Sequence, residues 1–544
     1  MKKVVFSATL FVILSVCACS RFDDMNKHPY ALYDAPSESF VQNILYKTEV
    51  GLLYATHDIS GQLMQYTLNT STAITSNMVY NYSLNETYTT RVWQHLYPQA
   101  GNVEKMLVTA RSEDNPAMTG VALCLKSLIY SNIADTYGNV PYKDAGRLAL
   151  MKENLDYTTS YDDIKEIYRS LLLNLEEANA CFIQADEKVR EGSLKTADFT
   201  PSCDYMFHGS ARQWRKFSNT LYLRLLMRCA MKVILDDGGV IHLNDDWGDV
   251  DVCSKLSEIY DGFISNTGNY PVMTSIEDCA RVGFSKTDAA LYSPFNYITD
   301  GDWNSHFICS TLIDALYDHN SNLFDPRTDW FSTRHKGTPT QLSKNTLDNY
   351  IASNTGLGRI PRGQSGAKND LREMDFASLL NFSEMLFIFA EAGARNYIGI
   401  SFPEIKQLYL DAIKSSILEW NTEIKADGAD MQQWLNIMGQ GIDADNTLKK
   451  VLNQKWVSLY WCGIESWCDY RRTGYPLLKT NGEAAENDNI LPTRLRYPAD
   501  EKYRNVDSYS QSINGWLGGS DNMQTEIWWA DTPESINQRK RGRL

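Results

Sequence analysis

The sequence of 544 residues lacks the short motifs that mark several large classes of enzyme and nucleotide-binding protein. It contains no H-E-x-x-H, no G-x-x-x-x-G-K-[ST] and no glycine fingerprint between a strand and a helix, so zinc peptidases, P-loop NTPases and dinucleotide-binding domains are not indicated. Residues 363–367, G-Q-S-G-A, come nearest to a hydrolase nucleophile elbow but lack its last glycine and a preceding strand. The sequence therefore supplies no motif for these enzyme classes.

Basic residues are also scarce relative to acidic ones. The chain has 52 Lys and Arg against 67 Asp and Glu, a formal net charge of −15. Nucleic acids require a basic protein face that neutralises phosphates, so no nucleic-acid partner is expected. None of the 11 cysteines forms a C-x-x-C pair, so zinc ribbons and redox motifs are not supported. Most cysteines are expected to be buried, and Cys253 with Cys279 is the one pair to test as a disulfide.

The apolar run near the start of the sequence is too short for a transmembrane helix. It covers residues 4–18 after two lysines, whereas crossing a bilayer takes about 20 residues. This pattern predicts a signal peptide over residues 1–18. The run ends in V-C-A-C, which resembles a bacterial lipobox, so we expect Cys19 to be acylated and residues 19–36 to form a lipidated tether. Contact with a membrane is then expected through the lipid anchor only.

Most of the remaining chain has the periodicity of amphipathic helices. Apolar residues recur at three- and four-residue steps, which predicts long helices over 38–57, 91–112, 116–135, 161–185, 210–235 and 402–420, with helices resuming near Phe376. Long helices joined by short turns favour antiparallel helical hairpins stacked as a solenoid. No clean 34-residue repeat is visible, so the repeat type does not follow from periodicity. The predicted fold class is mostly α.

One long segment, residues 237–373, breaks this helical pattern. It is rich in Asp, Asn, Ser and Gly and dense in aromatic residues. A structureless loop of that length is improbable in a compact domain unless it is functional or folded on itself. We therefore predict a single domain over 37–544, with a helical scaffold over 37–236 and 374–476. An irregular inserted lobe is expected over 237–373 and an irregular carboxyl-terminal segment over 477–544.

A stretch near the end of the scaffold predicts a buried structural helix pair. Trp456, Tyr460, Trp467 and Tyr470 surround several charged residues, so we expect a helix that is buried on several sides, with its charges paired. Gly463 is well placed for the left-handed turn that ends the first helix.

The same stretch resembles the carboxyl-terminal signature of the SusD/RagB family, nutrient-binding outer-membrane lipoproteins of Bacteroidetes-type bacteria. The matching segments are Gln454–Trp456, Gly463–Trp467 and Asp469–Pro476, and a second family marker is Ala134–Tyr142. The resemblance implies a tetratricopeptide-like scaffold of four helical hairpins (an α-α superhelix) and a protein that is not an enzyme. It also implies delivery of a glycan, or a peptide in some relatives, to a SusC-like TonB-dependent transporter.

The same resemblance bears on location. Residues 20–24, S-R-F-D-D, resemble the acidic segment that follows the acylated cysteine in surface-exported lipoproteins. The expected location is the outer membrane, with the protein facing the cell exterior, and retention on the periplasmic side is the alternative.

Aromatic side chains on the irregular segments are the predicted ligand platform, because flat rings can stack on the apolar faces of sugars while amides and carboxylates meet the hydroxyls. The candidate ligand-binding residues are Tyr80, Asn81, Tyr82, Tyr292, Tyr297, Asp302, Trp303, Asn304 and Trp330. For each aromatic residue, packing of the lobe onto the helices is the alternative. No cofactor or metal is expected, although Asp245, Asp246, Asp249 and Asp251 could also be read as calcium ligands.

A helical glycoside hydrolase is the competing function. Such an enzyme requires two carboxylates about 5–10 Å apart across an aromatic cleft. Asp300 or Asp302 with Glu86 is the best pair that the sequence offers, and nothing in their spacing favours it. Incubation with oligosaccharides would separate binding from turnover.

Overall fold

The computed structural model describes residues 35–71, 79–146, 158–340, 342–361, 370–479 and 487–541. The predicted signal peptide, Cys19, all of the tether before residue 35 and residues 363–367 lie outside this part of the chain. The described residues are mostly helical, which confirms the predicted fold class. The scaffold helices are α2 (Val41–Ala55), α3 (Gly61–Leu63), α4 (Glu86–Thr89), α5 (Arg91–Ser112), α6 (Pro116–Tyr137), α7 (Ile164–Arg190), α8 (Ala211–Asp237), α14 (Phe382–Ala394), α15 (Phe402–Trp420), α16 (Ala429–Gln440), α17 (Thr447–Ser458) and α18 (Glu465–Thr473).

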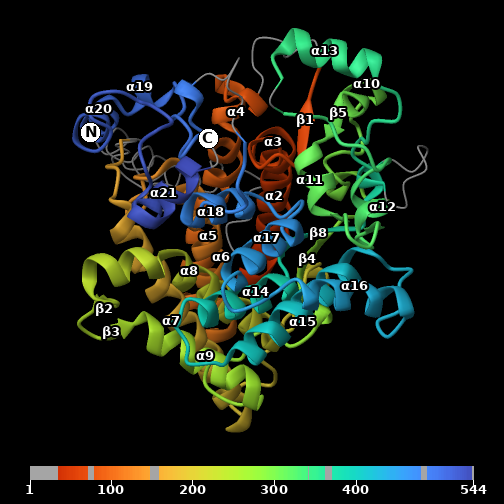
Figure 1. Cartoon of the computed structure of the whole chain (residues 1–544). Helices are drawn as coiled ribbons and strands as arrows, with labels where there is room; N and C mark the ends of the chain where they lie inside the picture. Colours follow the sequence, from red (N-terminus) through yellow and green to blue (C-terminus); the bar gives the residue numbers. More distant parts are fainter. Residues whose placement is uncertain are drawn as a thin grey trace, which may run out of the picture.

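The long helices pack as a continuous stack in chain order (Figure 1). Helix α2 packs on α5, α5 on α6, α6 on α7 and α7 on α8, and α8 then contacts α14, which packs against α15 and α17. Short turns join the neighbouring members of this stack at α5–α6 and α14–α15. The arrangement is the predicted solenoid of helical hairpins, in which each helix buries its apolar face on the next.

Local sequence signals fix where the helices begin and end. The Asn115 side chain accepts a hydrogen bond from the Met118 backbone at the start of α6, where Pro116 occupies the first turn. Ser210 caps α8 in the same way, and Gly238, with φ of 64°, ends it in a left-handed conformation. Such caps satisfy backbone groups that a helix end would otherwise leave without partners.

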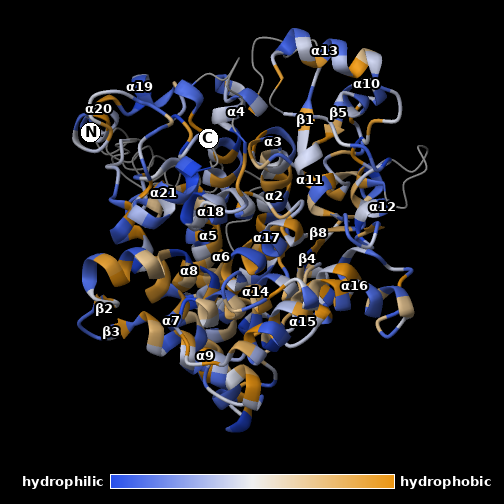
Figure 2. Cartoon of the chain, viewed as in Figure 1, coloured by the Kyte–Doolittle hydropathy of each residue, from blue (hydrophilic) through white to orange (hydrophobic). Residues whose placement is uncertain are grey.

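Helix α6 is buried on all sides. Among the described residues it is the one helix long and apolar enough to cross a membrane by length and composition, and 94% of its most apolar 18-residue window is buried. Its neighbours α5, α7 and α8 cover it in the stack. Figure 2 shows hydrophobic residues along the central helices, whereas the outer helices α19 (Glu501–Arg504) and α21 (Pro533–Arg541) are largely hydrophilic. The position and burial of α6 are those of a core helix.

Antiparallel strand pairs join the inserted lobe to the scaffold. Residues 300–331 of the lobe lie at the right of Figure 1, whereas residues 240–265 lie at its lower left and bottom. Strand β1 (Thr67–Asn69) pairs with β5 (His306–Ile308), and β4 (Ala280–Gly283) pairs with β8 (Phe376–Leu380). The other elements between residues 237 and 373 are β2 (Val240–Asn244), β3 (Gly248–Asp251), α9 (Val252–Ser265), α10 (Asp300–Asn304), α11 (Ser310–Ala315), β6 (Tyr317–Asp318), β7 (Leu323–Phe324), α12 (Thr328–Phe331) and α13 (Lys344–Ser353). Short 3-10 turns lie at Ser37–Phe40, Val79–Asn81, Pro201–Cys203, Ile276–Asp278, Ala289–Leu291, Leu371–Glu373, Asn487–Asn489 and Trp528–Ala530, and a π-helical turn extends α2 over Thr56–Ser60.

Three segments differ from the secondary structure predicted from the sequence. Helix α9 begins directly after the β2–β3 hairpin, so the lobe is not irregular from its first residue. Residues 376–380, predicted as the start of a helix, form strand β8, and helix α14 starts at Phe382. The carboxyl-terminal segment contains α19, α20 (Val506–Gly515) and α21. Strand β8 takes its form from pairing with β4, whereas α9 is an amphipathic helix of 14 residues that packs on α8.

The two family-like motifs meet in a buried polar cluster. The Asp135 carboxylate accepts hydrogen bonds from the Tyr168 hydroxyl (2.5 Å) and the Trp529 indole (2.8 Å). Arg228 on α8 pairs with both Asp135 and Glu465. The Arg471 guanidinium lies 3.8 Å from the Trp467 ring centroid and donates to the backbone oxygen of Asp135 (2.6 Å). This geometry confirms the prediction of a buried helix whose charges are paired, and Gly463 has the predicted left-handed φ of 57°.

Candidate functional site

A half-buried tyrosine, Tyr292, and an exposed one, Tyr297, lie on a loop of the lobe that is anchored to α2. The Tyr46 hydroxyl donates to the backbone oxygen of Tyr292 (2.9 Å), and the Tyr54 hydroxyl donates to that of Pro294 (3.5 Å). This anchoring holds the ring of Tyr297, whose exposed fraction is 72%, with its centroid 6.1 Å from that of Tyr292. A rigid helix thus presents a tyrosine ring to solvent, the arrangement that stacking on a ligand requires.

A polar cleft of about 230 Å³ lies on the same lobe, at the end of α10. Its walls include Asn304, Arg334 and Arg359, and its lining extends to Trp303, Thr333, Gly356, Leu357 and Ile360. Arg359 donates to the backbone oxygen of Asn304 (2.9 Å) and lies 4.5 Å from the Phe307 ring centroid, so its guanidinium is fixed. The side chains of Asn304 and Arg334 are exposed.

The tyrosine loop and the cleft are joined through the core of the lobe. Phe295, on the tyrosine loop, packs 5.9 Å from Trp303 of α10, centroid to centroid, and both rings are buried. We call Tyr292, Tyr297, Asn304, Arg334 and Arg359 the lobe face. It combines an exposed ring with amide and guanidinium donors, the groups that suit a hydroxyl-rich ligand. Sequence reasoning did not identify Arg334 and Arg359, because the loops that bring them beside α10 carry no motif.

Several candidate aromatic residues are packed inside the protein. Trp303 is 1% exposed, Tyr82 2% and Tyr80 3%. Burial raises the pKa of Tyr80 to about 12, and its ring joins an apolar cluster with Phe307 and Leu347. These three residues match the packing alternative in this structure, and contact between their rings and a ligand stays a prediction. Asn81 is half-buried beside them.

The candidate ligand-binding residues do not all lie at one place in the structure. Tyr292, Tyr297 and Asn304 lie on the lobe face, and Asp302 is held in α10, where its carboxylate accepts from the Thr299 hydroxyl (2.6 Å). Trp330 lines a different cavity, of about 390 Å³, that shares no lining residue with the cleft.

A buried histidine pair lies near Trp303, whose ring centroid is 6.2 Å from that of His57. The ring centroids of His57, in the π-helical turn after α2, and His306, the first residue of β5, lie 4.0 Å apart. Burial, with His57 adding to it, lowers the pKa of His306 to about 3, so this ring is neutral at physiological pH. The His57 Nδ1 atom lies 2.8 Å from Asp58, which also pairs with Arg91 at 2.8 Å. The contact between His57 and His306 thus lies at the junction between the lobe and the π-helical turn after α2.

The carboxylates of the competing hydrolase hypothesis serve local structure. Asp300 pairs with Arg372 (3.2 Å), and Glu86 accepts from the backbone amide of Ala499 (2.8 Å). Asp302 is the residue hydrogen-bonded to Thr299 within α10. None of these contacts forms a pair of carboxylates facing each other across the lobe face.

The remaining metal and disulfide hypotheses concern the β2–β3 hairpin and the cysteines. Asp249 lies 2.8 Å from His242 on the exposed hairpin, and the described residues contain no group of three or more His, Cys, Asp or Glu that could hold a metal ion. Cys253 and Cys279 are both free thiols.

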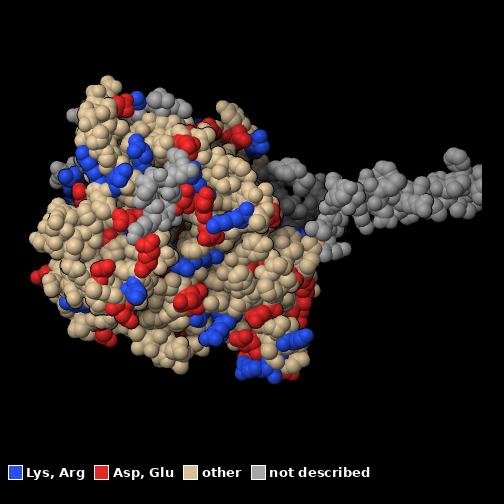
Figure 3. Space-filling view, turned by 90° about the vertical axis from the view of Figure 1, so that its right-hand side faces the viewer, with Lys and Arg blue, Asp and Glu red and all other residues tan. Residues whose placement is uncertain are grey.

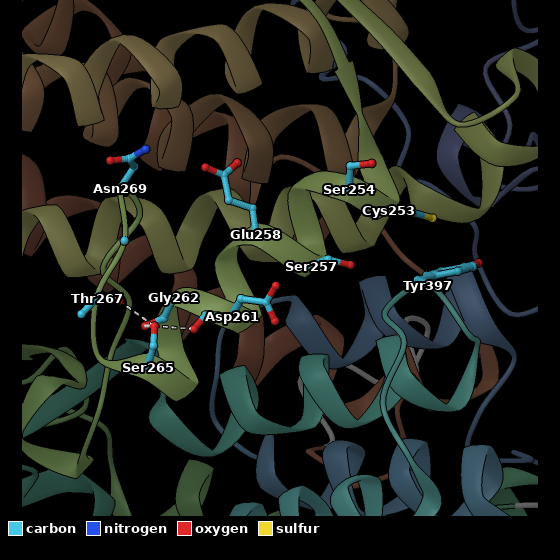
Figure 4. Close-up of a pocket in the computed structure, with 11 residues that line it drawn as sticks. Cys253, Ser254, Ser257, Glu258, Asp261, Gly262, Ser265, Thr267, Asn269 and Tyr397 are labelled. Atoms are coloured by element: carbon cyan, nitrogen blue, oxygen red, sulfur yellow. Dashed lines mark hydrogen bonds between the residues drawn. The ribbon is translucent and has the colours of Figure 1, made fainter.

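A larger hollow, of about 720 Å³, runs along α9 (Figure 4). Its labelled side chains are mainly hydroxyls and acids, among them Ser257, Glu258 and Asp261, with Tyr397 at one end. Ser265 and Thr267 are already hydrogen-bonded to each other (2.7 Å). None of its described lining residues has a buried polar atom without a partner. It lacks the convergent aromatic and donor groups of the lobe face, so we do not assign it as the site.

The charged side chains on the face shown in Figure 3 do not suggest a nucleic-acid partner. On the face of the molecule shown in Figure 3, Lys and Arg side chains are interspersed with Asp and Glu, and no continuous basic patch is visible. A nucleic-acid backbone would need such a patch.

Comparison with known proteins gives the relationships of the chain. A SusD-like family model described as "Starch-binding associating with outer membrane" matches residues 29–498. A solved chitin-binding protein is 20% identical, with a TM-score of 0.71, 91% of this chain covered and 99% of that one. A chitin-binding SusD homologue from Flavobacterium johnsoniae is 18% identical, with a TM-score of 0.68 and the same coverage. A SusD homologue from Bacteroides uniformis is 20% identical, with a TM-score of 0.68 and coverage of 92% and 100%.

At these identities the structural likeness shows a shared fold, and a comparison with curated protein sequences finds no significant match. The family model spans most of the chain, and the helical stack agrees with the tetratricopeptide-like architecture of the related structures. The chain therefore belongs to the SusD-like family of outer-membrane-associated binding proteins.

Proposed function

We propose that this protein is a non-catalytic, lipid-anchored outer-membrane protein that binds an oligosaccharide on the lobe face. The observation that carries the proposal is that the exposed Tyr297 ring and the Asn304–Arg359 cleft both lie on the inserted lobe of a chain of the SusD-like family. Two solved structures with this fold are named as chitin-binding proteins. A glycan chain, whose rings have apolar faces and hydroxyl edges, suits this surface better than a peptide does.

The bound glycan is then delivered to a SusC-like TonB-dependent transporter. Support for this partner comes from the family relationship, which is with outer-membrane-associated proteins. In this proposal Cys19 carries the lipid, and the protein faces the cell exterior as a lid that traps ligand against the transporter. The scaffold provides the rigid frame, because its charges are paired internally and its helices are packed in one stack.

A binding experiment on the purified protein tests the proposal. Oligosaccharides of four or more units, including chitin and starch fragments, are titrated by calorimetry. Tyr297→Ala removes the exposed ring and should weaken binding about tenfold, the size expected for loss of one aromatic contact. Tyr503→Ala is the matched control, because Tyr503 is 80% exposed but lies on α19, outside the lobe face. Equal affinities of the two variants would contradict the assignment of the lobe face.

Product analysis separates binding from hydrolysis. The protein should retain oligosaccharides without releasing new reducing ends over prolonged incubation. Release that disappears in an Asp302→Asn variant would instead support the glycoside hydrolase.

A further inference from the structure

The cavity lined by Trp330 is a second enclosed site, separate from the lobe face. It has a volume of about 390 Å³, within the range typical of small-molecule pockets. It lies where the lobe meets the scaffold, between β4, β8, the end of α15 and the turn after α17. Its walls are unusually aromatic, with Trp420, Tyr460 and Trp461 beside Trp330.

Four polar atoms on residues that line this cavity are buried without a hydrogen-bond partner among the described residues. They are the indole nitrogens of Trp330 and Trp461, the Nε atom of Arg281 and the Oδ1 atom of Asn381. The Trp330 and Asn381 side chains are 9% and 4% exposed. A buried polar group without a partner is costly, so a cluster of four favours a ligand that supplies the missing bonds.

The chemistry of these groups defines the ligand. Trp330 and Arg281 offer N–H donors, and Asn381 offers an acceptor, so the ligand must carry oxygen atoms that accept and hydroxyls that donate. The Arg281 guanidinium also lies 4.7 Å from the ring centroid of Phe376, which is 41% exposed.

The charges around the cavity disfavour an anion. Glu373 and Asp375 are exposed among its lining residues, and Asp375 pairs with Lys286 (2.6 Å). Glu419 adds a third acidic group, which accepts hydrogen bonds from the amide and hydroxyl of Ser383 (3.1 and 2.8 Å) and whose pKa is raised by burial. A negatively charged ligand would meet more acidic than basic groups here. The fitting class is therefore a neutral, hydroxyl-rich molecule with apolar faces for the aromatic walls.

We propose that this cavity binds a single neutral sugar ring, independently of any oligosaccharide on the lobe face. Hydroxyl oxygens of the ring accept from Trp330 and Arg281, and one hydroxyl donates to Asn381. The C–H face of the ring lies against the tryptophan walls. Occupation of the site joins β4 and β8 of the lobe junction to the end of α15, so the bound ring stabilises the attachment of the lobe to the scaffold.

Calorimetric titration of the full chain with D-glucose, D-galactose, D-xylose and N-acetyl-D-glucosamine tests the proposal. We expect saturable binding of at least one of these sugars with one site per chain. Trp330→Phe keeps a ring but removes the indole donor, and it should weaken that binding at least tenfold, as should Arg281→Met.

The matched control is Trp434→Phe, because Trp434 on α16 is likewise buried (3% exposed) and has an unpartnered indole nitrogen, but it does not line the cavity. It should leave the affinity for the sugar unchanged, as should Tyr297→Ala. Thermal unfolding of each variant checks that the fold is retained. Absence of saturable binding for all four sugars, retained affinity in Trp330→Phe, or an equal loss in Trp434→Phe would each overturn the proposal. Because Tyr297→Ala changes only the lobe face, failure of this site is distinguishable from failure of oligosaccharide binding.

Discussion

Arg472 on α18 and Glu391 on α14 form a buried ion pair through two parallel hydrogen bonds, of 2.6 and 2.7 Å. Both side chains are at most 2% exposed. Lys455 of α17 pairs with Asp469 at 2.7 Å, and Asp469 also pairs with Arg472 at 2.9 Å, so the charges of three helices balance one another. The signature stretch is thus a structural junction.

Breaking this pair from one side should strongly destabilise the protein. Arg472→Leu leaves Glu391 buried with its main partner removed, and we expect the free energy of unfolding to fall by about 3–5 kcal/mol. Denaturant unfolding measures the change. Arg504→Ala is the control, since its ion pair with Asp500 is exposed and is worth at most about 1 kcal/mol. A similar small loss in both variants would show that α18 is held by packing alone.

Glu391 should also set an acid limit on stability. Burial by itself would raise the pKa of this carboxyl, but Arg472 and Arg395 outweigh burial and lower the pKa to about 2. A lowered folded-state pKa gives stability that is present above the unfolded value of about 4.5 and is lost as the pH falls towards 2. Unfolding free energies measured from pH 5 to pH 2.5 should therefore fall less steeply in Glu391→Gln than in the wild type. An equal decrease of the unfolding free energy in Glu391→Gln and the wild type would contradict this prediction.

Glu49 should have the opposite effect. It is 2% exposed on α2, and burial raises its pKa to about 8. A raised folded-state pKa gives stability that is complete below about pH 4.5 and declines as the pH rises to about 8, by up to about 1.4 kcal/mol per unit. Glu49→Gln should remove this decline, whereas the exposed control Glu187→Gln should follow the wild type. Unfolding curves between pH 5 and pH 8.5 decide the matter.

Gly138, in the Ala134–Tyr142 segment, should not tolerate a side chain. Its φ is 88°, and an added Cβ would lie 1.8 Å from the Trp516 ring. Gly138→Ala should lower the unfolding free energy by about 2–4 kcal/mol through backbone strain and overpacking. Gly101→Ala, inside α5 with no atom within 4 Å of the added carbon, should instead stabilise the protein by about 0.5–1 kcal/mol. Thermal and denaturant unfolding of both variants provides the comparison.

The lipid anchor can be tested in cells. Cys19→Ala should move the protein from the membrane fraction to the soluble fraction and abolish fatty-acid labelling, because no other acylation site is proposed. Cys17→Ala removes the neighbouring cysteine and should keep both properties. Labelling that survives in Cys19→Ala but is lost in Cys17→Ala would reassign the anchor.

The long helices were predictable because their apolar residues follow a regular spacing. The expected bounds 91–112 and 402–420 coincide with α5 and α15. Strand β8 was predicted as helix because its apolar residues, Leu379 and Leu380, continue the spacing of α14, and only pairing with β4 makes that segment a strand. Local pattern cannot report a partner that lies almost 100 residues away in the chain.

The candidate site was predictable in region but not in detail. The lobe is dense in aromatic residues, yet sequence alone does not distinguish Tyr297, which is exposed, from Trp303, which is buried. That difference arises from how each loop packs on α2 and β5. The acceptor and donors of the second cavity come from Arg281, Trp330 and Asn381, which converge only after folding.

The hydrogen-bond partners of Asp135 bear on when the chain can complete its folding during synthesis. Its carboxylate takes hydrogen bonds from Tyr168, Arg228 and Trp529, so its last partner is synthesised nearly 400 residues after it. A growing polypeptide that stops short of Trp529 holds a buried carboxyl group that lacks one of these hydrogen bonds, which disfavours premature locking of the helices. Removal of the last 16 residues, which takes away Trp529, should thus be far more harmful than their number suggests.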